Sequence, residues 1–246
     1  MVTLNVYFNS VHRHDELEML VSSKAPLVFS VTPKRFAQSE GVAKYPDWFV
    51  ELIREAVKNP DVVLAQRGFS HKCRYVHSRV DPWHENDCLY HISFDDSERQ
   101  KDLMCMGIDA VLKAVGKVPD AYAPPNHIFN SATLSVANEL GYKFFMDQAN
   151  IKLAAYRHGR LVVVPENEVF EPNSDHYYVH YDHIEGKSKD NNKFSEKERQ
   201  AYARLFPSLQ PLSAIIPVDE PMHRLFLNGL IKRKNKLLRD VKNLRR

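Results

Sequence analysis

The sequence predicts an α/β fold made of parallel βαβ units, arranged either as a barrel or as a doubly wound sheet. Short apolar runs alternate with amphipathic helical segments about six or seven times along the 246 residues. The composition, 43% hydrophobic and 26% charged, is typical of a globular protein with a sizeable core. The eight glycines form neither a dinucleotide fingerprint nor a phosphate loop, which argues against nucleotide binding.

In the first half, Val2, Leu4, Val6 and Phe8 alternate with polar residues, as in a strand with one apolar face. Pro46 precedes an amphipathic segment and is typical of a helix start. In chain order we expect a strand over 2–8, a helix over 12–20, a strand over 25–31, a helix over 46–57 and a buried strand beginning at 62.

In the second half, Ser97-Glu98-Arg99-Gln100 forms a capping box that starts a long helix, and Gly116 ends it. Ser131 is the expected cap of the next helix, which ends at Gly141. The other expected elements are strands over 121–123, 144–147, 161–164, 177–180 and 214–218, a helix over 195–205 and mostly helix over 220–246.

Charge separates the carboxyl-terminal tail from the rest of the chain. Residues 223–246 hold nine basic residues and one acidic residue, a net charge of +8, while 1–222 hold 25 basic and 30 acidic residues, a net charge of −5. We therefore expect a barrel domain over 1–222 and a basic amphipathic helix over 223–246. That helix lies on an anionic membrane surface, engages an acidic polymer or partner, or packs its apolar stripe on the barrel. The acidic body argues against nucleic acid binding.

Targeting signals and cysteine content favour the cytoplasm, with the tail as the route to a peripheral membrane location. The amino terminus lacks the basic and apolar regions of a signal peptide, and no apolar run is long enough to span a bilayer. The three cysteines, Cys73, Cys88 and Cys105, have no disulfide framework spacing.

Four segments together resemble the polysaccharide deacetylase (NodB-homology) family. Arg67-Gly68-Phe69-Ser70-His71 is similar to its His-Gly-aromatic-Ser/Thr-His loop, and Tyr122-Ala123-Pro124-Pro125-Asn126 to its aromatic-Arg-Pro-Pro turn. Tyr178-Val179-His180 resembles the strand that supplies a catalytic histidine, and Phe8-Asn9-Ser10 the segment with paired aspartates. The resemblance covers about residues 1–185 and implies an irregular (β/α) barrel of about seven strands. It also implies hydrolysis of acetyl groups on glycans by zinc, or another divalent metal, held by one Asp and two His.

This chain departs from the family pattern where the metal and the base should be. Asn9 and Ser10 replace the two aspartates, and Arg67 replaces a ligand histidine. An amide is no general base near neutral pH, a neutral hydroxyl is a poor zinc ligand, and a guanidinium offers only donors. Of the usual ligands only His71 remains, and Ala123 stands where many members keep an arginine.

Two functions stay open on this sequence, both in carbohydrate metabolism and both with an acetylated glycan as the partner. One is a pseudoenzyme that binds glycans or acts as a scaffold, with Arg67 holding a carboxylate or sulfate of a sugar. The other is a hydrolase with a rearranged centre, in which Arg67 stabilises the oxyanion and His71 or His180 is the acid/base. The expected sugar-contacting residues are Asn9, Ser10, Pro125, Asn126, His127 and Tyr178.

A rebuilt metal centre has two candidate sources. His84, Cys88 and His91, with His71, have spacing and chemistry that suit zinc, although scattered residues in an irregular loop explain them too. Asp95-Asp96 looks like a displaced aspartate pair, but acids at a helix start account for it without a metal.

Overall fold

The computed structural model describes residues 2–8, 13–37, 44–70, 97–125, 129–148, 155–167, 178–183 and 196–217. Several predicted features lie outside these ranges. They are the tail helix over 223–246, the acidic pair at 95–96 and the site residues Asn9, Ser10, His71, His84, Cys88, His91, Asn126 and His127.

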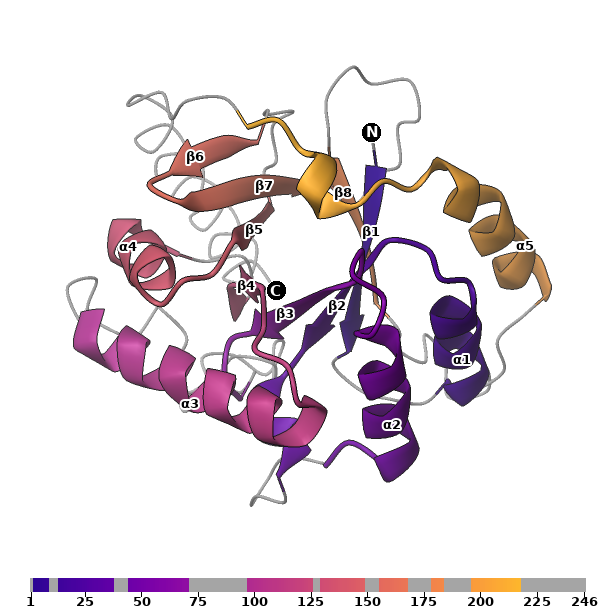
Figure 1. Cartoon of the computed structure of the whole chain (residues 1–246), viewed down its shortest axis with the longest axis horizontal. Helices are drawn as coiled ribbons and strands as arrows, with labels where there is room; N and C mark the ends of the chain where they lie inside the picture. Colours follow the sequence, from indigo (N-terminus) through magenta and orange to yellow (C-terminus); the bar gives the residue numbers. More distant parts are fainter. Residues whose placement is uncertain are drawn as a thin grey trace, which may run out of the picture.

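Seven parallel strands of the described chain form a barrel, as predicted (Figure 1). Neighbours along the sheet are β5, β4, β3, β2, β1, β8 and β7, and pairing of β5 with β7 closes the ring. The strands are β1 (Val2–Phe8), β2 (Leu27–Val31), β3 (Val63–Arg67), β4 (Ala121–Ala123), β5 (Phe144–Gln148), β7 (Leu161–Asn167) and β8 (Tyr178–His183).

The barrel is irregular at β7, which changes neighbours along its length. Its first residues pair antiparallel with β6 (Tyr156–His158) through a turn at Gly159, whereas Glu166 and Asn167 pair parallel with β8. On its other edge, residues 162–166 pair with β5. Strand β6 therefore pairs with the first part of one edge of β7, and β8 pairs with the last part of that edge.

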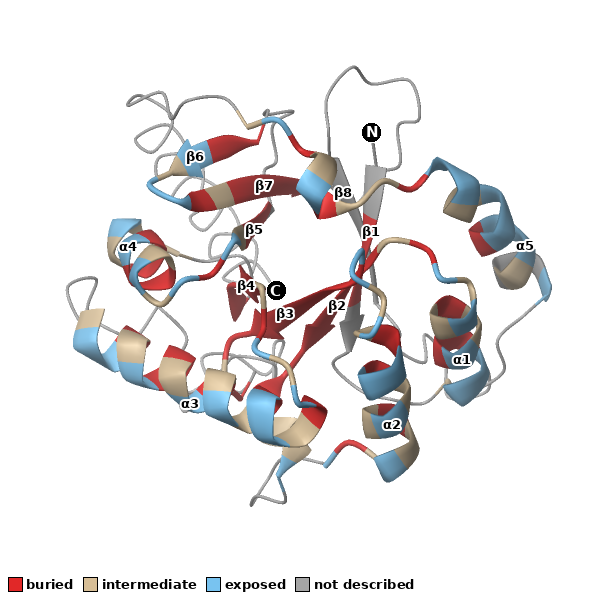
Figure 2. Ribbon diagram, viewed as in Figure 1, coloured by how far each residue is buried: buried red, intermediate tan, exposed pale blue. Residues whose placement is uncertain are grey.

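Helices cover the outside of the barrel with their apolar faces inward (Figures 1 and 2). Leu4, Phe29 and Leu64 of the strands pack against Leu17 and Phe49 of the helices. The α-helices are α1 (His14–Ser22), α2 (Asp47–Ala56), α3 (Ser97–Val115), α4 (Ser131–Glu139) and α5 (Glu196–Leu205). Short 3-10 turns are η1 (Pro33–Phe36), η3 (Phe206–Ser208) and η4 (Leu212–Ala214).

Strand alternation sorts the side chains between the outer core and the lumen of the barrel. The lumen is filled by small or medium apolar side chains, and Leu212 and Ile215 join the same cluster. Its strand members are Val28, Val63, Ala65, Ala121, Ala123, Met146 and Val164. Residues that alternate with the outer core, such as Asn5 between Leu4 and Val6, consequently face the lumen.

Three sequence predictions need correction. The predicted strand over 214–218 is wrong, because residues 212–214 form η4 and 215–217 belong to no strand. Pro211 and Pro217 flank this apolar run, in which Leu212 and Ile215 join the lumen cluster without strand pairing, whereas Ile216 is exposed. Strand β6 was not predicted, and the cap of α4 is Asn130, which forms a capping box with Thr133, rather than Ser131.

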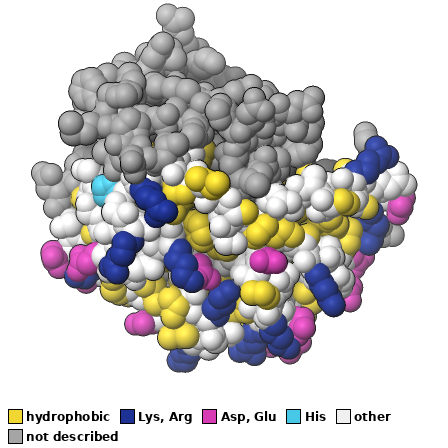
Figure 3. Space-filling view, turned by 45° about the horizontal axis from the view of Figure 1, so that its top comes forward, with side chains coloured by type: hydrophobic (Ala, Val, Ile, Leu, Met, Phe, Trp, Pro, Cys, Tyr) yellow, Lys and Arg dark blue, Asp and Glu magenta, His cyan; other side chains and the backbone are white. Residues whose placement is uncertain are grey.

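Surface charge is mixed on the described face of the molecule. Figure 3 shows Lys and Arg side chains interspersed with Asp and Glu on this face. Among the described residues, none of the helices combines the length and the apolar character that a membrane crossing requires.

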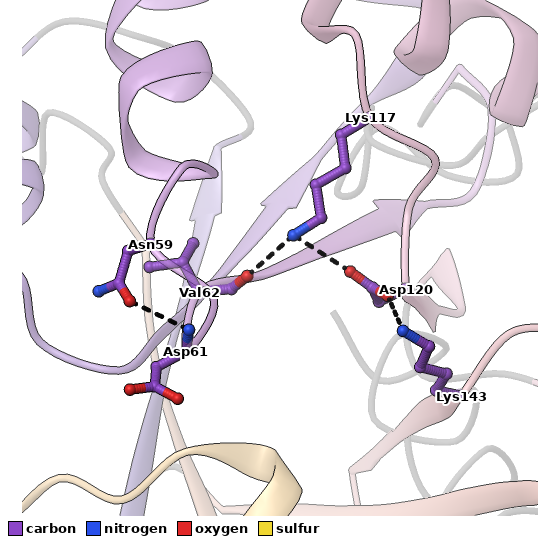
Figure 4. Close-up of polar contacts among 6 residues, drawn as sticks. All are labelled: Asn59, Asp61, Val62, Lys117, Asp120 and Lys143. Atoms are coloured by element: carbon purple, nitrogen blue, oxygen red, sulfur yellow. Dashed lines mark hydrogen bonds and ion pairs between the residues drawn. The ribbon is translucent and has the colours of Figure 1, made fainter.

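A polar network ties together the starts of β3, β4 and β5 at the amino-terminal end of the barrel (Figure 4). Asp120 binds Lys117 at 3.3 Å and Lys143 at 2.7 Å, and Lys117 also donates to the carbonyl of Val62 at 3.2 Å. The backbone N–H of Asp120 donates to Leu64 at 2.9 Å. These contacts fix the register of three neighbouring strands.

Helix α3 approaches β3 closely at Gly107. The amide of Gln66 donates to the carbonyl of Met104 at 3.3 Å and accepts from the Tyr142 hydroxyl at 2.7 Å. A Cβ at position 107 would overlap the Gln66 side-chain amide. The absence of a side chain at 107 therefore lets α3 lie on this buried polar group.

We expect Gly107→Ala to destabilise the protein by about 1–3 kcal/mol, because the clash with Gln66 outweighs the better helix propensity of alanine. Urea denaturation measures the change. Asp109→Ala, at an exposed position of the same helix, is the control and should stay within about 0.5 kcal/mol of wild type. A Gly107→Ala variant as stable as the control would contradict the close approach.

Candidate functional site

Arg67 ends β3 at the carboxyl edge of the barrel, where sites of (β/α) barrels are built. Val63 and Ala65 face the lumen, so alternation turns Arg67 to the same side. Its side chain is only 4% exposed. A buried guanidinium keeps its charge, and the shortage of water around it strengthens its interactions with nearby groups.

The segments that follow β2 and β3 carry hydroxyl groups and a second arginine, and together with Arg67 we call these residues the donor cluster: Thr32, Arg35, Tyr45, Arg67 and Ser70. Val31 of β2 pairs with Gln66 of β3, so Thr32 and Arg67, the next residues, lie side by side. The Tyr45 hydroxyl accepts the backbone N–H of Thr32 at 3.0 Å. Arg35 lies over the Tyr45 ring, with its guanidinium carbon 4.9 Å from the ring centre.

Burial and the two arginines act on the pKa of Tyr45 in opposite directions. Burial raises the pKa of the Tyr45 hydroxyl, while the positive charges of Arg35 and Arg67 partly offset that rise. The Thr32 hydroxyl also lies near enough to lower this pKa, although the two oxygens do not meet hydrogen-bond geometry. With a raised pKa, Tyr45 keeps its proton near neutral pH and remains a hydrogen-bond donor.

Two buried hydroxyls of the donor cluster are unsatisfied. Within the described part of the chain, Thr32 Oγ1 and Ser70 Oγ have no hydrogen-bond partner, and neither does Arg35 Nε. Thr32 is 1% exposed and Ser70 is 5% exposed, so bulk water does not replace the missing partners. An unpaired buried polar group costs about 1–3 kcal/mol, which a suitable ligand atom would relieve.

Backbone contacts hold the two segments that carry the donor cluster. The N–H of Lys34 donates to the carbonyl of Phe69 at 2.9 Å, which joins the turn after β2 to the turn after β3. The N–H of Gly68 donates to Ala123 at 3.2 Å, and Gly68 has φ +52°, a conformation that favours glycine. The geometry around Arg67 is therefore set by three neighbouring strands.

A chain of buried polar side chains crosses the lumen one layer below Arg67. Asn5 of β1 donates to Glu166 Oε1 of β7 at 2.6 Å and accepts from the hydroxyl of Ser30 of β2 at 2.8 Å. All three side chains are 0% exposed. Ser30 pairs with Ala65, two residues before Arg67, which places this chain beneath the donor cluster.

The residue at position 67 does not fit the zinc centre that the family resemblance implies. A metal ligand must offer a lone pair, and a buried guanidinium offers only N–H donors and a positive charge. Within the described ranges, no group of three His, Cys, Asp or Glu side chains is placed to hold a metal ion.

Four of the predicted site residues lie in the described chain. Arg67 and Pro125, which follows β4, are buried at the carboxyl end of the barrel. Tyr178 and His180 belong to β8, where Tyr178 pairs with Val2, and His180 pairs with Leu4 and with Asn167. The roles assigned to these four residues, and to those outside the described ranges, stay predictions.

Sequence reasoning missed the other polar residues of the lumen and the donor cluster. Asn5 and Ser30 are single polar residues inside apolar strands, a pattern that could have identified them. Glu166 follows Pro165, which ended the predicted strand too early, although β7 continues to Asn167. Tyr45 stands just before the Pro46 helix start, where nothing local links it to Arg67.

Comparisons with known proteins found likeness in solved structures. No family model matches the sequence, and no curated protein matches it. The 4-alpha-glucanotransferase from Thermococcus litoralis aligns with 93% of this chain and 38% of its own, with TM-score 0.56 and 11% identity. Because the identity is low, the match shows only a shared fold, between this chain and the aligned part of the glucanotransferase.

CE4 structures, the deacetylase class that the sequence motifs resemble, are also among the matches. The Xyl-CE4 domain of a xylanase from the hindgut metagenome of Trinervitermes trinervoides has 10% identity and TM-score 0.46, with 93% of this chain and 90% of that chain aligned. A CE4 family pseudoenzyme from Bacillus anthracis has 10% identity and TM-score 0.44, with 92% and 64% aligned.

We expect Asn5→Asp to destabilise the protein in a pH-dependent manner, because it places two carboxyl groups at hydrogen-bond distance in the lumen. Repulsion raises the pKa of one of them in the folded state above its unfolded value. Stability relative to wild type should therefore be lost as pH rises from 5 to 8 and recovered at low pH. Denaturation curves at several pH values measure this.

The double change Asn5→Asp with Glu166→Gln is the matched control, since it exchanges donor and acceptor and keeps one negative charge. It should recover most of the loss, about 1–3 kcal/mol near neutral pH. A pH-independent loss in the single variant, with no recovery in the double variant, would speak against the Asn5–Glu166 contact.

Proposed function

We propose that this protein binds an acetylated glycan at the carboxyl-terminal end of its barrel and does so without the metal hydrolysis typical of the deacetylases that it resembles. The observation that carries the proposal is Arg67, a buried guanidinium on the inner face of β3, at the position that the resemblance assigns to a metal ligand. The location is expected to be cytoplasmic.

The surroundings of Arg67 support binding of an oxygen-rich ligand. Sugars and their acetyl groups offer hydroxyl and carbonyl oxygens, and the donor cluster supplies guanidinium N–H groups and hydroxyls. Hydrogen bonds from charged donors contribute about 1.5–3 kcal/mol each to stability or binding. This cluster is therefore suited to orienting a sugar even though it holds no metal ligand set.

The chemistry of positions 9, 10 and 67 supports binding over metal-dependent hydrolysis. Asn9 and Ser10 supply neither a base nor an anionic ligand, and Arg67 adds a charge that opposes a cation. A hydrolase with a rearranged centre is the competing function. In it, Arg67 would stabilise the oxyanion, and acetate release would depend on this residue.

Calorimetric titration with an oligosaccharide of N-acetylglucosamine tests the proposal. We expect binding to the wild-type protein and a roughly 10- to 100-fold weaker affinity for Arg67→Met, from the loss of a charged donor. Lys143→Met, at the opposite end of the barrel, is the control and should bind like wild type. No binding by a folded wild-type protein would refute the proposal.

Acetate release in the same samples separates binding from catalysis. We expect no release above background, with or without added zinc. Release by the wild type that disappears in Arg67→Met would instead establish the rearranged hydrolase.

Restoring the family pattern tests the assignment of the metal positions. The triple variant Asn9→Asp, Ser10→Asp and Arg67→His should gain zinc affinity, because it supplies carboxylate and imidazole ligands next to His71. Equilibrium dialysis against zinc measures the gain, with Arg67→His alone as the control. Equal zinc binding by the triple and single variants would show that the segments have been matched wrongly to the family.

A further inference from the structure

We propose that the protein has a second binding site, which takes a medium-chain fatty acid, in a pocket between α1 and α2 at the amino-terminal end of the barrel. The pocket has a volume of about 400 Å³, within the range of roughly 300–1,000 Å³ that is typical of small-molecule sites. It lies at the end of the barrel opposite to Arg67 and is therefore separate from the proposed glycan site.

The pocket is a hollow in the outer core, where α1 and α2 end and β2 and β3 begin. Leu20 and Lys24 come from the end of α1 and the turn after it, and residues between 55 and 59 come from the end of α2. Leu27, the first residue of β2, and Val62, just before β3, complete the lining. The two helices lie side by side on the outside of the barrel (Figure 1).

The interior of the pocket suits an alkyl chain. Its walls are formed by apolar side chains of the outer core, none of them more than 6% exposed: Leu20, Ala25, Leu27, Phe29, Ala56 and Val62. These side chains offer no hydrogen-bonding group to a ligand. An unbranched chain therefore gains about fourfold in affinity for each methylene that it buries among them.

The charged residues that line the mouth of the pocket favour an anionic head group. Glu55 and Lys58 form an ion pair with each other. Lys24 is exposed and forms no ion pair with any residue in the described part of the chain. A carboxylate at the mouth of the pocket would supply the missing counter-charge to its ammonium group.

The carbonyl groups at the end of α1 are hydrogen-bonded, which weakens their repulsion of an anion. The Ser23 hydroxyl donates to the carbonyl of Leu20 at 2.6 Å, and the N–H of Lys24 donates to the carbonyl of Val21 at 3.3 Å. The negative partial charge of a helix end resides on such carbonyl groups when they have no partner. The ammonium group of Lys24 therefore remains the main charge at this side of the mouth.

Asn59 holds the mouth of the pocket in place. Its side-chain amide donates to the carbonyl of Lys24 at 3.0 Å, and its side-chain oxygen accepts from the N–H of Asp61 at 3.0 Å (Figure 4). These contacts join the turn after α1 to the segment after α2. The shape of the pocket is thus set before a ligand arrives, which lowers the entropy cost of binding.

Lys24 has a backbone conformation that favours glycine. Its φ of +52° lies in the left-handed region, which is unfavourable for any residue with a Cβ. It follows the end of α1, where proteins commonly use glycine. A role of the ammonium group in binding accounts for a lysine at a position where glycine is less strained.

Isothermal titration calorimetry with octanoate, decanoate and octanol tests this site. We expect the wild type to bind decanoate about 10- to 20-fold more tightly than octanoate, because two more methylenes are buried. The ratio of octanoate affinity to octanol affinity should fall by about 2- to 5-fold in Lys24→Met, the value of one exposed ion pair. Lys113→Met, at an exposed position of α3 outside the pocket, is the control and should keep the wild-type ratio.

No binding of decanoate by the folded wild-type protein would overturn the inference. An unchanged affinity ratio in Lys24→Met would overturn the anionic head group.

Two further variants separate binding from stability. Lys24→Gly removes the strained side chain, so the protein should become as stable as wild type or more stable, while octanoate binding weakens as in Lys24→Met. Ala56→Leu fills the hollow and should abolish decanoate binding without loss of stability. Thermal unfolding measures stability. Decanoate binding by Ala56→Leu with wild-type affinity would show that the ligand lies elsewhere.

Sedimentation velocity identifies a competing occupant. Val21 lines the pocket and is half-buried, so Val21→Asp would disrupt packing of another molecule against this face. We expect a sedimentation coefficient that neither Val21→Asp nor decanoate changes. A wild-type dimer that dissociates in Val21→Asp would overturn the fatty-acid site in favour of a second copy of this chain.

Discussion

The closed ring of parallel strands is the constraint on which the rest of this structure depends. Closure gives each strand an inner face, and the side chains of all inner faces share one narrow lumen. Because side chains alternate along a strand, every second residue faces this lumen. Small apolar residues such as Ala65, Ala121 and Val164 fill this space, while larger ones such as Phe29 and Phe49 lie outside among the helices. Polar side chains in the lumen must therefore bind one another or a ligand.

The buried polar groups in this barrel form two sets, one with hydrogen-bond partners and one without partners in the described chain. Asn5, Ser30 and Glu166 satisfy one another through two hydrogen bonds across three strands, so their burial is compensated. Thr32 and Ser70, nearer the carboxyl edge, are left without partners within the described part of the chain. Such unsatisfied groups lower stability, and in proteins they are common at binding sites. The contrast separates the structural layer of the lumen from the layer proposed to bind sugar.

Arg67 changes the chemistry that this barrel end can perform. An imidazole at that position would offer a lone pair to a metal, whereas the guanidinium offers donors and a permanent charge. Arg35 and Tyr45 come from the segment between β2 and α2, 32 and 22 residues earlier in the chain. The side chain that stands where the family resemblance implies a metal ligand thus accompanies further hydrogen-bond donors, which suit oxygen-rich groups.

The sequence by itself determined the order of the strands and helices, because apolar periodicity, capping and glycine signals act locally. The bounds of α3, from Ser97 to Val115, and of β4 were predictable for that reason. It also singled out Arg67, which stands where the family resemblance implies a ligand histidine. Local rules failed for residues 214–217, where Ile215 is buried without strand pairing and Ile216 is exposed, and for β6, which pairs with an edge of β7.

Only the tertiary structure decided which polar residues meet. Glu166 and Asn5 lie 161 positions apart and come together because closure of the barrel brings β7 near β1. Tyr45 joins Arg67 because Thr32 and Arg67 occupy neighbouring register positions. Register and closure are properties of the whole sheet, so no local pattern encodes these contacts.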